Sequence, residues 1–255
     1  MAKPASRIVR WLAVASTMGV LAVKPTPALA YRPFDGTDAA VADVHEVEIE
    51  FGPVGLLREG SQHTVITPAV VLNYGVVANW EVVLQGQGEF ASSPSRGRTS
   101  IRDNGLFLKG VVRPGVLQGE SGPSVATEFG ALLPDLRTGG EQSNTGASLA
   151  GIVSDRWGWL TTHLNVQAAL SREHEPDYFV SAIFEGPFDW AVRPVSEIFY
   201  EWDAAAGETR VSGLVGAIWR ADENLSFDAG LREARNNDRP VTEIRLGFTI
   251  GFSPW

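Results

Sequence analysis

The chain has 255 residues and a formal net charge of −9, with 21 basic and 30 acidic residues and no cysteine. The missing cysteines exclude a disulfide framework and any thiolate metal site. Four of the basic residues lie in residues 1–30, and two of these are lysines. Lys109 is the one lysine beyond residue 30. A nucleic-acid partner is not expected, because phosphate contacts need clustered cations.

The first 30 residues have the order of a secretory signal peptide. Lys3, Arg7 and Arg10 make a basic start, an apolar run covers residues 11–23, and Ala28-Leu29-Ala30 supplies a small-x-small cleavage site. The run is too short for a membrane-spanning helix, which needs about 20 residues. We expect cleavage after Ala30 and export of a mature chain that begins at Tyr31. Residues 31–43 are then expected to form an N-terminal periplasmic segment, and residues 44–255 one β-barrel domain.

Beyond residue 43 the hydrophobic pattern has a period of two, which indicates β-strands. The end of the chain shows it well, because Leu246, Phe248 and Ile250 share one face while Arg245 and Thr249 lie on the other. Applied in chain order, the pattern predicts about twelve strands. They cover residues 44–51, 64–74, 80–90, 105–113, 123–133, 145–154, 158–170, 177–186, 191–202, 208–220, 224–233 and 241–252.

The predicted connections alternate in length. Tight turns follow most even-numbered strands, at residues 75–79, 155–157, 187–190 and 221–223. Longer polar loops are expected after the odd-numbered strands, at residues 52–63, 91–104, 134–144, 171–176, 203–207 and 234–240. The connection 114–122 departs from this pattern, because it should be short and is not. Short turns on one rim and longer loops on the other are typical of outer-membrane barrels.

Aromatic residues gather at the predicted strand ends. Trp80, Trp157, Trp159, Trp190, Trp219 and Trp255 lie beside the short turns or the C-terminus, and Phe90, Tyr178, Tyr200 and Trp202 lie at the other rim. Such belts mark the two interfaces of a membrane. The sequence therefore predicts an all-β, transmembrane, antiparallel up-and-down β-barrel in a Gram-negative outer membrane, in contact with membrane lipid. A soluble periplasmic barrel or sandwich is the alternative, because its strands also alternate with period two.

The polar face of the strands carries charged residues, which would cost roughly 2–4 kcal/mol each for Arg or Lys at the middle of the bilayer. We therefore expect them to line the interior, where they either set the selectivity of a pore or fill and rigidify it. Arg210 is expected opposite Glu201, and Arg245 near the row of Glu46, Glu48 and Glu50. The predicted pore-lining residues are Glu81, Gln85, Lys109, Arg113, Arg193, Glu197, Glu201, Arg210, Asp228, Arg232, Glu243 and Arg245.

Several segments resemble the phenol-degradation MetA-pathway family of outer-membrane barrels. They include the mature start YRPFDGTDAA, the strand VEIEFG, and the later segments SGPSVATEFGALLP and VSGLVGAIWRADENLSFDAGLR. The resemblance implies a channel for passive uptake of small molecules, aromatic ones among them. These segments are strand–turn–strand patterns, so the resemblance supports fold and compartment and supplies no binding residues.

No motif for a cofactor, a metal site or a catalytic centre is recognised. The carboxylates of the predicted loop 172–177 could bind a cation. A solvated charged loop is the simpler interpretation of the same residues. A lipid hydrolase using His163 with Asn165 is a rival to the channel, but alternation puts both residues on the polar face, away from lipid. A structural or adhesive barrel is the third possibility. The solute, the oligomeric state and a plug formed by a loop or by residues 31–43 are left open.

Overall fold

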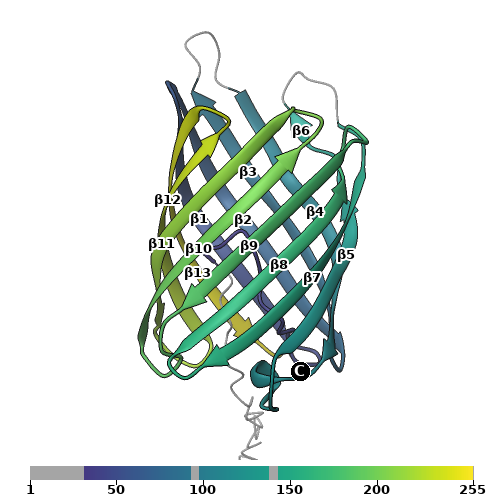
Figure 1. The fold of residues 1–255 in the computed structure, drawn as a ribbon, viewed down its shortest axis with the longest axis vertical. Coiled ribbons are helices and arrows are strands. Elements are labelled where there is room, and N and C mark those ends of the chain that lie inside the picture. The colour runs from purple at the N-terminus through teal and green to yellow at the C-terminus, as the bar shows by residue number, and fades with distance from the viewer. Residues whose placement is uncertain (1–31, 93–97, 138–142, 255) are drawn as a thin grey trace, which may run out of the picture.

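The strands form one closed antiparallel barrel (Figure 1). This computed structural model describes residues 32–92, 98–137 and 143–254. Neighbouring strands follow the order β3-β2-β1-β13-β12-β11-β10-β9-β8-β7-β5-β4, and pairing of β3 with β4 closes the wall. The predicted signal peptide, its cleavage before Tyr31, and Trp255 lie outside the described residues.

The strands cover nearly all of the barrel wall. They are β1 (Val47–Glu59), β2 (Gln62–Val77), β3 (Trp80–Ser92), β4 (Arg98–Arg113), β5 (Ser124–Leu132), β6 (Leu136–Arg137), β7 (Gly146–Trp157), β8 (Leu160–Leu170), β9 (Pro176–Glu185), β10 (Val192–Asp203), β11 (Glu208–Arg220), β12 (Leu225–Asn236) and β13 (Arg239–Phe252). The two-residue β6 continues β5 along the same partner β4, so the wall has twelve strands. The predicted barrel of about 12 strands is confirmed. Within the described residues, no helix is long and apolar enough to cross a membrane.

The apolar face of the strands points outward. Leu164 and Val166 on β8 are exposed, whereas their neighbours His163 and Asn165 are buried inside the barrel. The same alternation puts Ile198 outside on β10. A soluble barrel would have the opposite arrangement, because its apolar side chains would fill the interior. The outward apolar wall therefore supports a membrane barrel over the soluble alternative.

Exposed aromatic residues follow the two rims. Trp157, Trp159 and Trp190 are exposed at the rim that carries the tight turns and the C-terminus, here called the turn rim. At the opposite rim, here called the loop rim, Tyr178 stacks on Trp202 with ring centroids 5.6 Å apart. Both positions match the predicted belts, and rings of this kind prefer the membrane interface.

The loop rim has shorter connections than the sequence predicts. The expected loop 52–63 is wrong, because β1 continues to Glu59 and β2 begins at Gln62. The Gly52-Pro53 pair suggests a turn but forms a β-bulge between Phe51 and Val54, which accommodates the missing N–H of Pro53. Thr67 on β2 donates a hydrogen bond of 2.7 Å to the carbonyl of Pro53. The expected loop 234–240 is likewise a two-residue turn between β12 and β13.

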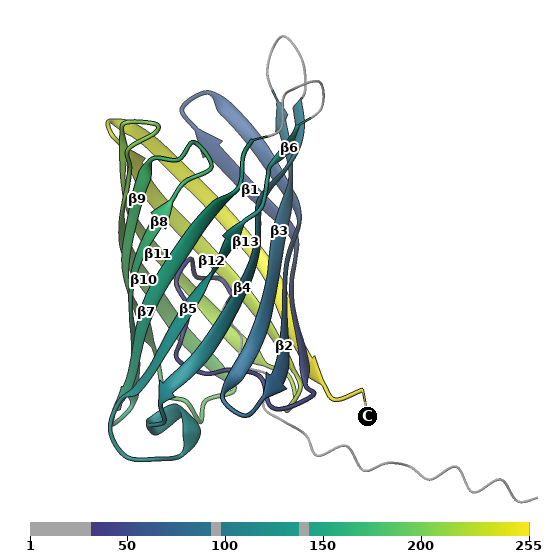
Figure 2. The ribbon, with the colours of Figure 1, turned by 90° about the vertical axis from the view of Figure 1, so that its right-hand side faces the viewer.

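The N-terminal segment, residues 32–46, lies inside the barrel (Figure 2). It rises from the turn rim to about the middle of the barrel and returns to the same rim, where β1 begins. The sequence assigns residues 31–43 to the periplasmic side and leaves open whether they plug the bore. The structure places residues 32–43 within the lumen, where Ala39 is fully buried.

The long connection 114–122 has a structural reason in this segment. It contains the short helix η1 (Val116–Gln118), whose Leu117 packs against a buried cluster of Ala39, Ala126 and Ile152. The side chain of Gln118 donates a hydrogen bond of 2.9 Å to the carbonyl of Ala39. The extra residues therefore brace the N-terminal segment from the turn rim.

Candidate functional site

The lumen wall carries most of the predicted lining residues. Buried on the inner face are Glu81, Lys109, Glu197, Asp228, Arg232 and Glu243, and partly buried on the same face are Gln85, Arg193, Glu201, Arg210 and Arg245. Arg113 departs from the prediction. A bulge between Val111 and Arg113 ends the alternation of β4, and Arg113 is exposed at the turn rim, where it donates a hydrogen bond to the carbonyl of Pro123.

The N-terminal segment is held to the wall through its own backbone. The N–H groups of Asp35 and Gly36 both donate to Glu197 on β10, each at 2.8 Å. The N–H of Thr37 donates to Asn165 on β8 at 3.1 Å. Further along, the N–H of Ala42 donates to Glu81 on β3 at 2.7 Å. The segment thus crosses the lumen from one side of the wall to the other.

Ion pairs fix the first turn of the segment. Asp35 pairs with Arg245 at 3.0 Å and also with Arg232. Both arginines in turn contact Glu243, each at 2.9 Å. The expected approach of Arg245 to Glu46, Glu48 and Glu50 is wrong. The register of β1 on β13 sets Arg245 opposite Gly55 instead, whereas Glu50 lies opposite Thr249.

Lys109 anchors the middle of the segment. Its ammonium lies 3.8 Å from Asp38 and 3.5 Å from Glu81, and it donates to the hydroxyl of Thr37 at 3.2 Å. Burial raises the pKa of the Asp38 carboxyl above its usual range, while the nearby charge of Lys109 acts in the opposite direction. Lys109 therefore joins the N-terminal segment to the barrel wall.

Ser154, His163 and Glu185 form a buried chain of polar groups. The Oγ of Ser154 lies 2.8 Å from Nδ1 of His163, and Nε2 of His163 lies 3.2 Å from Glu185. The N–H of Ala39 donates to the same Oγ at 2.9 Å. Ser154 is fully buried and lines neither of the two described cavities, so no path to a substrate is visible at it. The chain of groups holds the segment, and it faces the lumen, not lipid.

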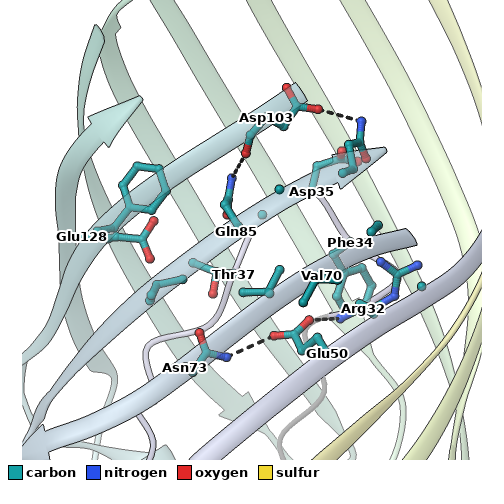
Figure 3. Close-up of a pocket in the computed structure, with 18 of the residues that line it drawn as sticks. Arg32, Phe34, Asp35, Thr37, Glu50, Val70, Asn73, Gln85, Asp103 and Glu128 are labelled. Atoms are coloured by element: carbon teal, nitrogen blue, oxygen red, sulfur yellow. Dashed lines mark hydrogen bonds between the residues drawn. The ribbon is translucent and has the colours of Figure 1, made fainter. Parts of the chain in front are cut away.

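The segment divides the lumen into two cavities. The loop-side cavity has a volume of about 350 Å³, and Figure 3 shows Asp103, Gln85 and Glu128 on its wall, with Phe34 and Asp35 of the segment projecting into it. The turn-side cavity has a volume of about 550 Å³. Its walls include Arg156, His163, Glu185, Phe188 and Arg193. Glu81 lines both cavities.

The predicted pair of Glu201 and Arg210 is confirmed. The two residues lie opposite each other on β10 and β11, and their side chains are 3.1 Å apart. They lie toward the loop rim, away from the segment. The row of Arg193, Glu197 and Glu201 is therefore divided, since Arg193 pairs with Glu185 in the turn-side cavity while Glu197 binds the segment.

The fold is shared with known outer-membrane channels. The structure is similar to the COG4313 outer membrane channel from Pseudomonas putida F1, with a TM-score of 0.65, 10% identity, and coverage of 86% of this chain and 100% of that one. It also resembles the KdgM porin, with a TM-score of 0.50, 12% identity, and coverage of 80% and 98%. The NanC porin gives a TM-score of 0.51, 6% identity, and coverage of 80% and 98%. No family model and no curated protein matches the sequence.

Proposed function

We propose that this protein is an outer-membrane channel through which small solutes diffuse passively, and that the N-terminal segment closes it in the state described above. No cofactor and no covalent step is involved. The solute passes from the loop-side cavity to the turn-side cavity once residues 32–43 are displaced. The two cavities suit small molecules, since they fall in the range of about 300–1,000 Å³ that is usual for small-molecule sites.

The polar attachment of the segment is the observation that carries this proposal. Its backbone is held by Glu197, Asn165 and Glu81 through hydrogen bonds that water can replace, and its apolar contacts are confined to Phe34 and Ala39 among the described clusters. A core packed from apolar side chains would be much harder to open, because the whole transfer free energy of those side chains would be lost. The fold shared with the KdgM porin and the COG4313 channel agrees with such a role.

The lining residues give the channel its selectivity. Charged groups on the wall set the field along the path, and polar groups replace part of the solute's hydration. Phe34, Phe107 and Phe179 add aromatic surface to the loop-side cavity. This surface suits a solute with an apolar or aromatic part, in line with the resemblance to the phenol-degradation MetA-pathway family.

A structural barrel is the second candidate, and the ion pairs between the N-terminal segment and the barrel wall favour it. Asp35 links the segment to Arg232 and Arg245 on neighbouring strands, as a permanent plug would require. The lipid hydrolase has less support, because His163 is 2% exposed and points into the lumen. Conductance separates the two remaining candidates.

A cross-link between segment and wall tests the proposal. A side chain on Gly36 would point directly at Ser181 on β9, and the natural chain has no cysteine to compete. We expect the Gly36→Cys/Ser181→Cys variant, in planar bilayers, to lose most of its openings when oxidised and to regain them on reduction. A variant that lacks residues 32–43 should conduct almost continuously.

The two single-cysteine variants are the matched controls, and neither should respond to oxidant. If the wild type and the deletion variant both carry no current, and vesicles that contain them admit no small solute, the channel proposal fails and the structural candidate stands. If the oxidised double variant conducts as well as the reduced one, passage does not require displacement of the segment.

A further inference from the structure

Three arginine side chains converge on one phenylalanine ring at the turn rim. Phe188 lies in the connection between β9 and β10, and the guanidinium carbons of Arg156, Arg220 and Arg193 lie 4.5, 5.7 and 5.9 Å from the centre of its ring. Arg156 and Arg220 lie near the ends of β7 and β11, and Arg193 lies near the start of β10. The face of an aromatic ring attracts guanidinium groups, so Phe188 draws together three like charges that would otherwise repel one another.

The positive charge of this cluster is only partly neutralised. Arg193 pairs with Glu185 at 3.4 Å, and the same carboxylate also contacts His163. Within the described part of the chain, neither Arg156 nor Arg220 forms an ion pair with a carboxylate at 4.0 Å or less. Arg156 uses its side chain for a long hydrogen bond of 3.5 Å to Thr161. Three guanidinium groups therefore share one carboxylate.

Other arginines of the lumen differ from this cluster. Arg210 pairs with Glu201 at 3.1 Å, and Arg232 and Arg245 both contact Glu243. The chain as a whole carries more acidic than basic residues, with 30 against 21. A group of arginines with too few carboxylates is thus a local exception in an acidic protein, and it leaves guanidinium donors available to an anion.

The cluster faces an open space. Arg156, Arg193 and Phe188 line the turn-side cavity of about 550 Å³, which is large enough for a small ligand beside them, while Arg220 contacts the ring without lining the cavity. The other walls of this cavity are acidic and carry Asp38, Asp43, Glu46, Glu48, Glu81 and Glu185, so the arginines form its one cationic side. Guanidinium groups present paired N–H donors that match the oxygens of a carboxylate or a phosphate. The position of the arginines and their donor geometry therefore point to an anionic group held on the arginine side of the cavity.

We propose that Arg156, Arg193 and Arg220 around Phe188 form a binding site for the carboxylate or phosphate group of a small ligand. The site deepens the proposed function, because it places an anion-binding position at the turn-side exit of the lumen. It rests on that function in one respect, which is that a ligand reaches the site through the lumen. The anionic group has two sources. One is a dissolved solute, and the other is a phospholipid headgroup, because Trp157 and Trp219 beside the cluster belong to the interfacial belt.

Equilibrium binding of inorganic phosphate tests the site. The full mature protein is reconstituted in nanodiscs of zwitterionic phosphatidylcholine, and phosphate binding is followed by calorimetry. We expect the Arg156→Gln/Arg220→Gln variant to bind phosphate at least tenfold more weakly. The Arg156→Lys/Arg220→Lys variant should bind phosphate with an affinity between those of the glutamine variant and the wild type, because it retains both charges but loses the paired N–H donors. Heat-modifiable migration on gels confirms that each variant forms a barrel.

Arg210→Gln is the matched control, because it removes an arginine at the loop rim that already has a carboxylate partner. It should leave phosphate binding unchanged. Nanodiscs containing anionic phosphatidylglycerol distinguish the two sources, since a headgroup in the site abolishes phosphate binding whereas a solute site still binds phosphate. Equal affinity of the glutamine double variant and the wild type, or no phosphate binding in neutral nanodiscs, overturns the proposal. Phosphate binding is independent of conductance, so failure of the site leaves the channel proposal untouched.

Discussion

The carboxylate of Glu197 binds the backbone of Gly36, 161 residues away in the sequence, through a hydrogen bond of 2.8 Å. The second carboxylate oxygen accepts the N–H of Asp35 at the same distance. Hydrogen bonds to a charged acceptor contribute about 1.5–3 kcal/mol each. One side chain on β10 therefore holds two consecutive backbone groups of the N-terminal segment.

Replacing Glu197 should loosen the plug. We expect Glu197→Ala to raise the open fraction of the channel about tenfold or more in planar-bilayer recordings, because both acceptors are lost. Glu197→Gln should have a smaller effect, since one amide oxygen can still accept. An open fraction unchanged in both variants would show that the contacts of Glu197 do not limit opening.

Neutralising Glu197 and Glu201 together should shift ion selectivity toward anions. The double variant Glu197→Gln/Glu201→Gln leaves Arg210 without its carboxylate partner, so the local field becomes more positive. The reversal potential in a salt gradient measures this shift, and it does not depend on how often the channel opens. Glu233→Gln is the control, because Glu233 is exposed outside the lumen beside Thr242. A shift of equal size in the control would argue against a path along this wall.

Adjacent positions on β8 test which face meets lipid. Val166 is exposed on the outer wall, and Gln167 lines the loop-side cavity. We expect Val166→Arg to destabilise folding into vesicles by about 2–4 kcal/mol, because the guanidinium enters hydrocarbon. Gln167→Arg should cost much less. Urea titration of vesicle-folded protein gives both values, and a reversed order would mean that the faces are assigned the wrong way round.

Gly75 provides a steric test of the plug. A methyl group at Gly75 would overlap the carbonyl oxygens of Asp43 and Ala42, where the segment returns to the wall. We therefore expect Gly75→Ala to displace the segment and to raise the open fraction of the channel. Gly213→Ala is the matched control, since an added methyl there meets nothing within 4 Å. Identical recordings for the two variants would contradict close docking at Gly75.

The alternation of side chains was enough to predict the wall of the barrel. The period-two pattern puts Leu246 on the outer face and Glu197 on the inner face, where the structure has them, because lipid separates the two kinds of side chain strictly. The pattern failed at Gly52-Pro53 and at Arg113, where bulges add a residue and change the face. Gly52-Pro53 has the residue pattern of an ordinary turn and Val111-Val112-Arg113 that of an ordinary strand, so neither bulge can be recognised from the sequence.

The same alternation cannot predict that the N-terminal segment plugs the lumen. Its attachment depends on backbone N–H groups, which every non-proline residue has and which no side-chain pattern reveals. The acceptors are Glu197, Asn165 and Glu81, whose alternation predicts only that they face the lumen. Nothing in their spacing indicates that the chain's own backbone binds them. The position of Arg245 failed for a related reason, since the register of β1 on β13 depends on the bulge in β1.

The attachment of the segment also fixes an order of assembly. Residues 32–43 are the first of the described chain to be synthesised, yet their partners lie on β3, β8, β10 and β13, up to 214 residues further on. The binding position exists only after the barrel has closed, so the segment docks last. Contacts formed this late have little influence on the rate of folding and act mainly on the rate of unfolding. During insertion into the membrane, residues 32–43 therefore stay in solution until β3 pairs with β4 and closes the barrel. Until then Glu197 and Asn165 are hydrated.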